Sequence, residues 1–156
     1  MANKVLKFIT TGFYSGLAPT APGTFGSLAY LIIWLLLFQQ SFYLQIFALL
    51  LVTIGGYLAT KAYLQLISSE SSDDSHADPS YIVIDEWAGL ALALLAASKT
   101  EPFTILLAFM LFRLFDIWKP WLIAKADNLA GALGIMADDL LAGAGAALIL
   151  ILSRLI

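Results

Sequence analysis

Three charged residues stand at three-residue spacing near the end of a strongly apolar segment, in the sequence FRLFDIWKPW. They are Arg113, Asp116 and Lys119, and Pro120 ends the helix that this segment predicts. Residues at i and i+3 lie on neighbouring turns of a helix, so the three side chains are expected to be close together. The carboxylate of Asp116 could bind a metal or activate water, and the two cations beside it could bind phosphate. A structural ion pair between Arg113 and Asp116 explains the same spacing. Because Arg113 lies inside an apolar bundle, the functional interpretation is favoured.

Two pairs of adjacent acids stand where further apolar helices are expected to begin. The sequence IVIDEWAG contains Asp85 and Glu86, and GIMADDLLAG contains Asp138 and Asp139. Adjacent side chains point about 100° apart on a helix, so one acid of a pair could bind a metal while the other contacts Arg or Lys. The structural alternative is that acids at a helix start stabilise the helix dipole. The sequence AGAGAA after the second pair predicts a small-residue face for close helix packing.

A loop rich in proline, glycine and hydroxyl residues, GLAPTAPGTFGS, runs directly into the first long apolar segment. Gly23 and Gly26 permit close backbone approach, Thr24 and Ser27 offer hydroxyls, and a helix N-terminus offers free N–H groups to an anion. The loop therefore predicts a phosphate cradle formed by Thr24, Gly26 and Ser27. It is not a Walker loop, because no lysine follows the second glycine. The structural alternative is a turn with a helix N-cap at Thr24 or Ser27.

The composition indicates a membrane protein. Of 156 residues, 61% are hydrophobic and only 12% are charged, which is far from soluble averages and fits a single domain over residues 1–156. The small net charge of −3 and the lack of a basic stripe exclude a nucleic-acid partner. With no cysteine and one histidine, thiolate chemistry and a multi-histidine centre are excluded, so any metal would be bound by oxygen. No signal peptide is expected, because the N-terminal apolar stretch lacks a convincing small-residue cleavage site.

Apolar segments predict the elements that must position these groups, as an all-α integral membrane bundle of about four to five helices. The segments cover residues 27–38, 42–58, 82–97, 103–115 and 140–156. A spanning helix needs roughly 20 apolar residues, with about 17 at the lower end, so residues 42–58 qualify while residues 27–38 would span only obliquely. The first two segments predict a helical hairpin. The alternative is an unusually apolar soluble bundle.

If these segments alternate in direction, the polar connections fall on two unequal sides. One side holds residues 1–26, 61–81 and 119–139 with the lysines at positions 4, 7, 61, 119 and 125, whereas the other side has only Lys99 and Arg154. The positive-inside rule makes the first side cytoplasmic. The acid-bearing motifs also border this side, so the sequence predicts polar site loops on the cytoplasmic face.

The hydroxyl and glycine loop, the acids and the two cations together predict a phosphoryl-transfer site at a lipid–water boundary. Mg²⁺ prefers carboxylate oxygens, water and substrate phosphate, and Arg and Lys suit the remaining phosphate oxygens. A small membrane transporter is one alternative, but it would place its ionisable residues near the midplane. A non-catalytic membrane scaffold is another, but it gives no reason for acids and cations to converge.

Four motifs in this order, GLAPTAPGTFGSL, IVIDEWAG, FRLFDIWKPW and GIMADDLLAG, resemble the phosphatidylglycerophosphatase A family over residues from about 12 to 143. The resemblance implies a Mg²⁺-dependent phosphatase that hydrolyses phosphatidylglycerophosphate to phosphatidylglycerol in phospholipid biosynthesis. It also implies a largely helical, multi-pass protein of the bacterial cytoplasmic (inner) membrane, with the active site facing the cytoplasm. The chain departs from the family pattern at Ala130 and Ala132 and lacks a second proline after Trp121, but none of these departures touches an acid.

The resemblance assigns roles to particular residues of this chain. The implied catalytic acids are Asp85, Glu86, Asp116, Asp138 and Asp139, of which all but Asp138 are expected to bind the metal, with Arg113 and Lys119 beside them.

No residue pattern marks a phospho-enzyme nucleophile, so direct attack by a metal-activated water is favoured, with Arg113 and Lys119 stabilising the transition state. An aspartate nucleophile, Asp85 or Asp116, stays open. His76 lies in a polar, acidic loop and is expected to be a solvated surface residue, with a substrate contact as the alternative.

Overall fold

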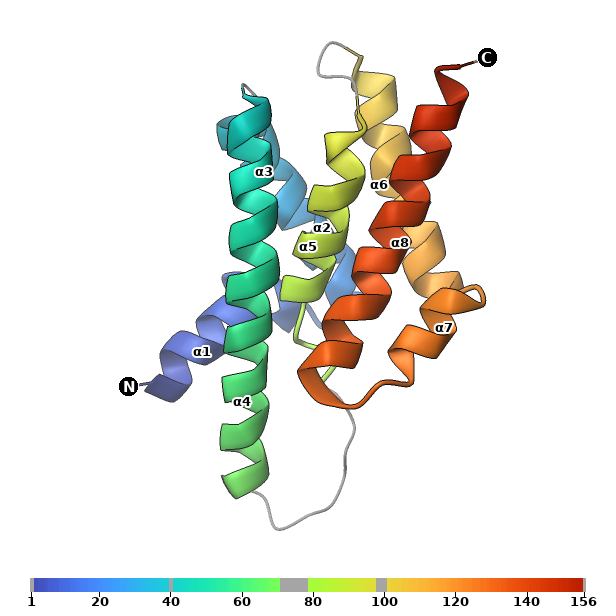
Figure 1. Cartoon of the computed structure of the whole chain (residues 1–156). Helices are drawn as coiled ribbons and strands as arrows, with labels where there is room; N and C mark the ends of the chain where they lie inside the picture. Colours follow the sequence, from blue (N-terminus) through green and yellow to red (C-terminus); the bar gives the residue numbers. More distant parts are fainter. Residues whose placement is uncertain (1, 40, 71–78, 98–100, 156) are drawn as a thin grey trace.

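The computed structural model describes residues 2–39, 41–70, 79–97 and 101–155, and every regular element within these ranges is a helix (Figure 1). The predicted all-α class is therefore confirmed for this part of the chain. The helices are α1 (Ala2–Thr10), α2 (Pro22–Ile33), α3 (Phe42–Leu50), α4 (Gly56–Glu70), α5 (Ile84–Leu95), α6 (Pro102–Trp118), α7 (Leu122–Asp127) and α8 (Gly131–Ser153). A 3₁₀ turn (Ser15–Leu17) precedes α2, and π turns continue α2 (Trp34–Phe38) and join α3 to α4 (Leu51–Gly55).

Two helices in the described ranges are long and apolar enough to cross a membrane. One runs continuously through α3 and α4 over Phe42–Ser69, and the other is α8. In the most apolar 18-residue segment of each helix, 22% of the residues are buried for Phe42–Ser69 and 44% for α8. Much of the apolar surface of both helices therefore faces outward. The helix from Pro22 to Leu37 is apolar but shorter.

The first apolar helix begins earlier than the sequence indicated. It starts at Pro22 rather than Ser27, because proline suits the first position of a helix, where no N–H is needed for an intrahelical bond. Ala21 is the N-cap residue, and Thr24 lies inside α2. The alternative prediction of an N-cap at Thr24 or Ser27 is therefore wrong.

The last helix also begins earlier, at Gly131 instead of residue 140. Asp138 and Asp139 consequently lie inside α8, and the prediction that they open this helix is wrong. The apolar pattern stopped at these acids, but the helix continues past them because their side chains lie in the site described below. Helices α1 and α7 were not predicted at all.

Helix α5 is the centre of the bundle and lies between the α2–α4 part and the α6–α8 part (Figure 1). After the two acids of its first turn it is apolar and rich in small residues, and eight of its twelve residues are buried, which is expected of a helix at the core of a bundle. It packs most extensively against α8. A Cβ at Gly143 would overlap the carbonyl oxygen of Gly89, so only glycine permits this close approach. The predicted small-residue packing face is thus confirmed at Gly143.

The start of α5 is fixed by the N-terminal part of the chain, through Val83. This residue is fully buried, and its N–H donates to the carbonyl of Thr10 at 2.9 Å. Gly16 and Gly26 pack directly on its side chain, where a Cβ at either position would come within 2.8 Å and 2.6 Å of it. Gly16 in the 3₁₀ turn and Gly26 in α2 therefore hold the residue that immediately precedes α5, and with it the acids of the first helical turn.

Candidate active site

A cavity of about 420 Å³ lies at the end of the bundle where α2, α5 and α8 begin and α6 ends. This is the lower end in Figure 1. Its lining includes two cations, Arg113 and Lys119, and six acids, which are Asp85, Glu86, Asp116, Asp127, Asp138 and Asp139. The acids thus outnumber the cations by four. Such an excess of negative charge in a partly buried site is relieved by protonation or by a bound cation.

Three of the acids form a group that could hold a metal ion. Asp85, Glu86 and Asp139 each offer one carboxylate oxygen, and these oxygens all lie within 4.8 Å of one another. Asp85 Oδ1, Glu86 Oε2 and Asp139 Oδ1 are buried and have no hydrogen-bond partner among the described residues. Buried carboxylate oxygens without a partner are costly, and several of them together fit an oxygen-seeking cation such as Mg²⁺. The donor set therefore suits the metal that the sequence predicted.

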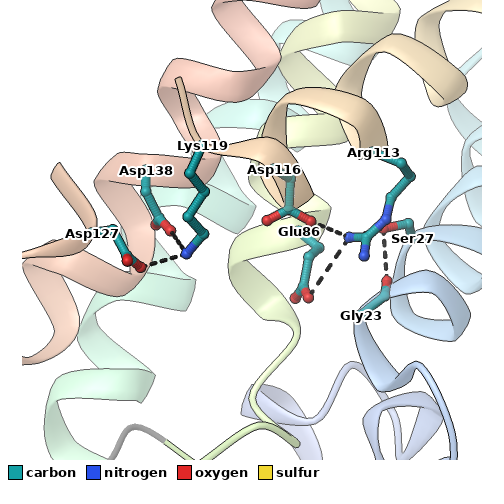
Figure 2. Close-up of polar contacts among 8 residues, drawn as sticks. All are labelled: Gly23, Ser27, Glu86, Arg113, Asp116, Lys119, Asp127 and Asp138. Carbon is teal, nitrogen blue, oxygen red and sulfur yellow. Dashed lines mark hydrogen bonds and ion pairs between the residues drawn. The ribbon is translucent and has the colours of Figure 1, made fainter. Parts of the chain in front are cut away.

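Arg113 lies beside this group and has three polar neighbours (Figure 2). Its Nη1 lies 2.5 Å from Asp116 Oδ2, 3.9 Å from Glu86 Oε1 and 3.4 Å from Ser27 Oγ. The side chains of Arg113, Asp116 and Glu86 are only 12–14% exposed. The i, i+3 ion pair is thus present, and it lies in the wall of the cavity. The structural and the functional interpretations of the spacing are consequently compatible.

Lys119 does not continue the face of α6 that carries Arg113, because α6 ends at Trp118 and Lys119 adopts a left-handed conformation with φ of 46°. Its Nζ donates to Asp127 and, at 2.7 Å, to Asp138 Oδ2 (Figure 2). Burial by itself lowers the pKa of Lys119, but the two carboxylates outweigh burial and raise the pKa above its ordinary value. The ammonium group therefore stays charged at neutral pH.

The start of α2 approaches the acids at Gly23. A Cβ there would overlap Glu86 Oε1, so the cavity wall needs a glycine at this position. The predicted phosphate contacts Thr24, Gly26 and Ser27 do not line the cavity. Ser27 is fully buried, donates to the carbonyl of Gly23 at 2.8 Å and accepts from Arg113, so it orients the guanidinium. The first turn of α2, at Gly23 and the two residues before it, is the part that faces the cavity.

The structure brings together all seven of the acids and cations predicted for the site, and it adds one that the sequence did not indicate. Asp127 ends α7, lines the cavity and pairs with Lys119. Nothing in the sequence around Asp127 distinguishes it from a surface residue, and only its position eight residues after Lys119, across the break at Pro120, could have hinted at the contact. His76 and Asp78 lie outside the described residues.

The chain is similar to several known proteins over most of its length. The sequence profile of the family described as Phosphatidylglycerophosphatase A matches residues 8–154. A Bacteroides thetaiotaomicron protein, provisionally named a phosphatidylinositol-3-phosphatase, is 36% identical over 94% of this chain and 91% of its own length. Proteins named Phosphatidylglycerophosphatase A are similar as well: that of Escherichia coli K12 is 36% identical over 86% of this chain and 75% of its own length, and that of Haemophilus influenzae Rd is 38% identical over 88% and 81%. No solved structure gives a significant match.

Proposed function

Because the chain belongs to the phosphatidylglycerophosphatase A family and is therefore a phosphatase, we propose that it hydrolyses phosphatidylglycerophosphate to phosphatidylglycerol and phosphate in a Mg²⁺-dependent reaction. The observation that carries this proposal is the grouping of Asp85, Glu86 and Asp139, whose ligand oxygens lie within 4.8 Å, beside the guanidinium of Arg113 in one cavity. The carboxylates of this cavity would by themselves repel a phosphate. A bound phosphate therefore needs both a metal ion and the positively charged guanidinium of Arg113.

The residues of the cavity take three proposed roles, which are metal binding, proton transfer and phosphate binding. Asp85, Glu86, Asp116 and Asp139 are the proposed metal ligands, and Asp116 and Asp138 are the acids placed to receive or supply a proton. Arg113 binds oxygens of the phosphoryl group that is transferred, Lys119 offers a second cation to phosphate oxygens of the lipid, and the first turn of α2 at Gly23 adds the favourable end of a helix dipole. A bound Mg²⁺ would supply electrostatic stabilisation of the phosphoryl group and acidify the attacking water.

Hydrolysis in this site would proceed by attack of water on the phosphorus of the monoester. The bond between phosphorus and the glycerol oxygen breaks, the glycerol oxygen takes up a proton, and inorganic phosphate leaves. Arg113 forms hydrogen bonds with the equatorial oxygens, where negative charge is spread in the transition state. Ser27 and Asp116 keep the guanidinium in place through the contacts at 3.4 Å and 2.5 Å.

We further propose that the chain is a single domain that spans the cytoplasmic membrane several times, with the cavity facing the cytoplasm. Support comes from the two helices of sufficient length and from the many large apolar side chains that are exposed along the bundle, such as Phe47, Leu51 and Met110, which are 57–58% exposed. The acids and cations gather at one end of the bundle, where a lipid headgroup at the membrane surface could reach them.

Phosphatidylinositol 3-phosphate is a second candidate substrate. The observation that favours it is the name of the Bacteroides relative, which matches 94% of this chain. Both lipids present a phosphomonoester on a polyol headgroup, so the same metal and guanidinium could serve either.

The test is phosphate release by the purified full-length protein in neutral detergent. Phosphatidylglycerophosphate, phosphatidylinositol 3-phosphate, phosphatidic acid and glycerol 3-phosphate would be compared at equal concentrations, with Mg²⁺ and with EDTA. We expect the highest kcat/KM with phosphatidylglycerophosphate and no turnover in EDTA. Equal turnover of soluble glycerol 3-phosphate, or turnover in EDTA, would contradict the proposal.

A further inference from the structure

The cavity contains two separate clusters, each formed by one cation and two acids, and the cations of the two clusters differ in how far they are exposed to solvent. The inner cluster is Arg113 with Asp116 and Glu86, and the outer cluster is Lys119 with Asp127 and Asp138 (Figure 2). No ion pair joins the two clusters within the described ranges. The Arg113 side chain is 14% exposed, whereas the side chains of Lys119 and Asp127 are 31% and 48% exposed. The two cations are therefore placed for different contacts.

Only the inner cluster shares a residue with the group that could hold a metal ion. Glu86 is both a partner of Arg113 and a member of the group that could hold a metal ion, so a phosphate bound by Arg113 would also meet the metal. Asp138 and Asp139 are neighbours on α8 and send their side chains to different partners, since adjacent residues point about 100° apart. Asp139 joins the candidate metal group, and Asp138 binds Lys119.

The position of Lys119 is held by an unusual backbone. Lys119 has φ of 46° and Trp121 has φ of 35°, on either side of Pro120. A left-handed conformation is unfavourable for a residue other than glycine and persists only where the surrounding structure enforces it. Here it turns the lysine from the end of α6 toward α7 and α8, onto the outer rim of the cavity.

From these observations we infer that the two cations bind the two phosphates of one lipid: Arg113 binds the phosphomonoester that is hydrolysed, and Lys119 binds the phosphodiester that joins the headgroup to the diacylglycerol. The inference rests on the proposed function and adds how the second phosphate of the substrate, its phosphodiester, is bound. Phosphatidylglycerophosphate and phosphatidylinositol 3-phosphate both have this pair of groups, separated by a polyol. Phosphatidic acid has a monoester alone.

Asp127 would act as the counterion that the diester replaces. It is the most exposed member of the outer cluster, so its carboxylate can move into water when a diester oxygen takes its place on Lys119. Asp138 is 7% exposed and stays in contact with the ammonium group. Removal of the Asp127 charge should therefore strengthen diester binding, and removal of the Lys119 charge should weaken it.

The experiment measures inhibition of phosphatidylglycerophosphate hydrolysis by two probes that each carry one of the two groups. Short-chain phosphatidylglycerol has the diester and no monoester, and inorganic phosphate resembles the monoester. In Lys119→Gln, KM and the inhibition constant of phosphatidylglycerol should rise about tenfold or more, as expected for loss of a charge-assisted hydrogen bond. The inhibition constant of inorganic phosphate and kcat should change less than about twofold.

Three further variants make the test specific. Lys119→Arg keeps the charge and should retain inhibition by phosphatidylglycerol within a few-fold. Lys125→Gln removes the same charge from an exposed position of α7 that does not line the cavity, and it should behave as wild type. Asp127→Asn should lower the inhibition constant of phosphatidylglycerol, and this result decides the matter if Lys119→Gln does not fold.

Several outcomes would overturn the inference. They are an equal rise of both inhibition constants in Lys119→Gln, no change of either, a loss of kcat in the folded variant, or a weaker response to phosphatidylglycerol in Asp127→Asn. If wild type hydrolyses phosphatidylglycerophosphate in these cases, only the inference fails. If wild type releases no phosphate from this lipid, the proposed function fails and the inference with it.

Discussion

Gly23→Ala is expected to separate activity from stability, because a methyl group at this position meets a functional side chain and no backbone. A Cβ built on Gly23 overlaps Glu86 Oε1 and lies 3.1 Å from its Cδ and 3.3 Å from Arg113 Nη1. The Glu86 oxygen must therefore move by about 1 Å to reach an ordinary contact, and a misplacement of that size can cost roughly 10²-fold in rate. The fold itself should tolerate the change, since alanine is favoured over glycine in a helix by as much as about 1 kcal/mol.

The assay for Gly23→Ala combines the temperature of unfolding in detergent with phosphate release at several Mg²⁺ concentrations. We expect an unchanged or higher unfolding temperature, a fall in kcat of about 10²-fold, and a higher Mg²⁺ requirement, because Glu86 is a proposed ligand. Gly55→Ala is the matched control, since nothing lies within 4 Å of a Cβ there, and it should keep wild-type activity. Wild-type kcat and Mg²⁺ requirement in Gly23→Ala would refute the placement of Glu86 in the reacting centre.

Three further tests address other parts of the account. Asp116→Asn should lower kcat by at least about 10²-fold, and Arg113→Lys should also lower turnover because it loses the planar guanidinium. If the double variant Asp116→Asn with Arg113→Gln recovered both folding and turnover, the ion pair would be purely structural. Gly143→Ala should lower the unfolding temperature, because its Cβ meets the backbone of α5 and overpacking costs roughly 1–3 kcal/mol. An unchanged unfolding temperature would count against the close α5–α8 packing. Because the chain has no cysteine, a single introduced cysteine can be labelled specifically. In intact cells, Thr20→Cys should react only with a membrane-permeant thiol reagent, whereas Ser41→Cys should also react with an impermeant one. The reverse pattern would overturn the proposed topology.

The sequence predicted the helical class and most of the charged lining of the cavity, because both depend on strong local patterns. Long apolar segments interrupted by glycine and proline define helices, and Asp85, Glu86 and Arg113 are conspicuous because charges are rare in such segments. The i, i+3 geometry of Arg113 and Asp116 follows from helix periodicity alone, and the ion pair at 2.5 Å agrees with it.

Contacts that depend on tertiary structure could not be predicted in this way. Asp127 reaches Lys119 only because the chain reverses through Lys119 and Trp121, which have positive φ, and no local pattern of side chains encodes this turn. Gly26 belongs to a sequence motif that resembles a phosphate cradle, but in the structure it lies inside α2 and is needed for the packing of Val83, a residue 57 positions later. The start of α8 was misplaced because the charges of Asp138 and Asp139 ended the apolar pattern, whereas in the folded chain these charges face the cavity.

The most direct test of the central claim is the rate of phosphate release from phosphatidylglycerophosphate as a function of Mg²⁺ concentration, measured for the wild type and for Asp139→Asn. Asp139 is 2% exposed and one of the three proposed ligands that lie within 4.8 Å of one another, so the change removes a metal-binding charge with almost no change of shape. The account predicts saturable activation of the wild type by Mg²⁺, no turnover in EDTA, and a loss of at least about 10²-fold in the folded Asp139→Asn variant at any Mg²⁺ concentration. Full turnover of the wild type in EDTA, or wild-type turnover by Asp139→Asn, would contradict it.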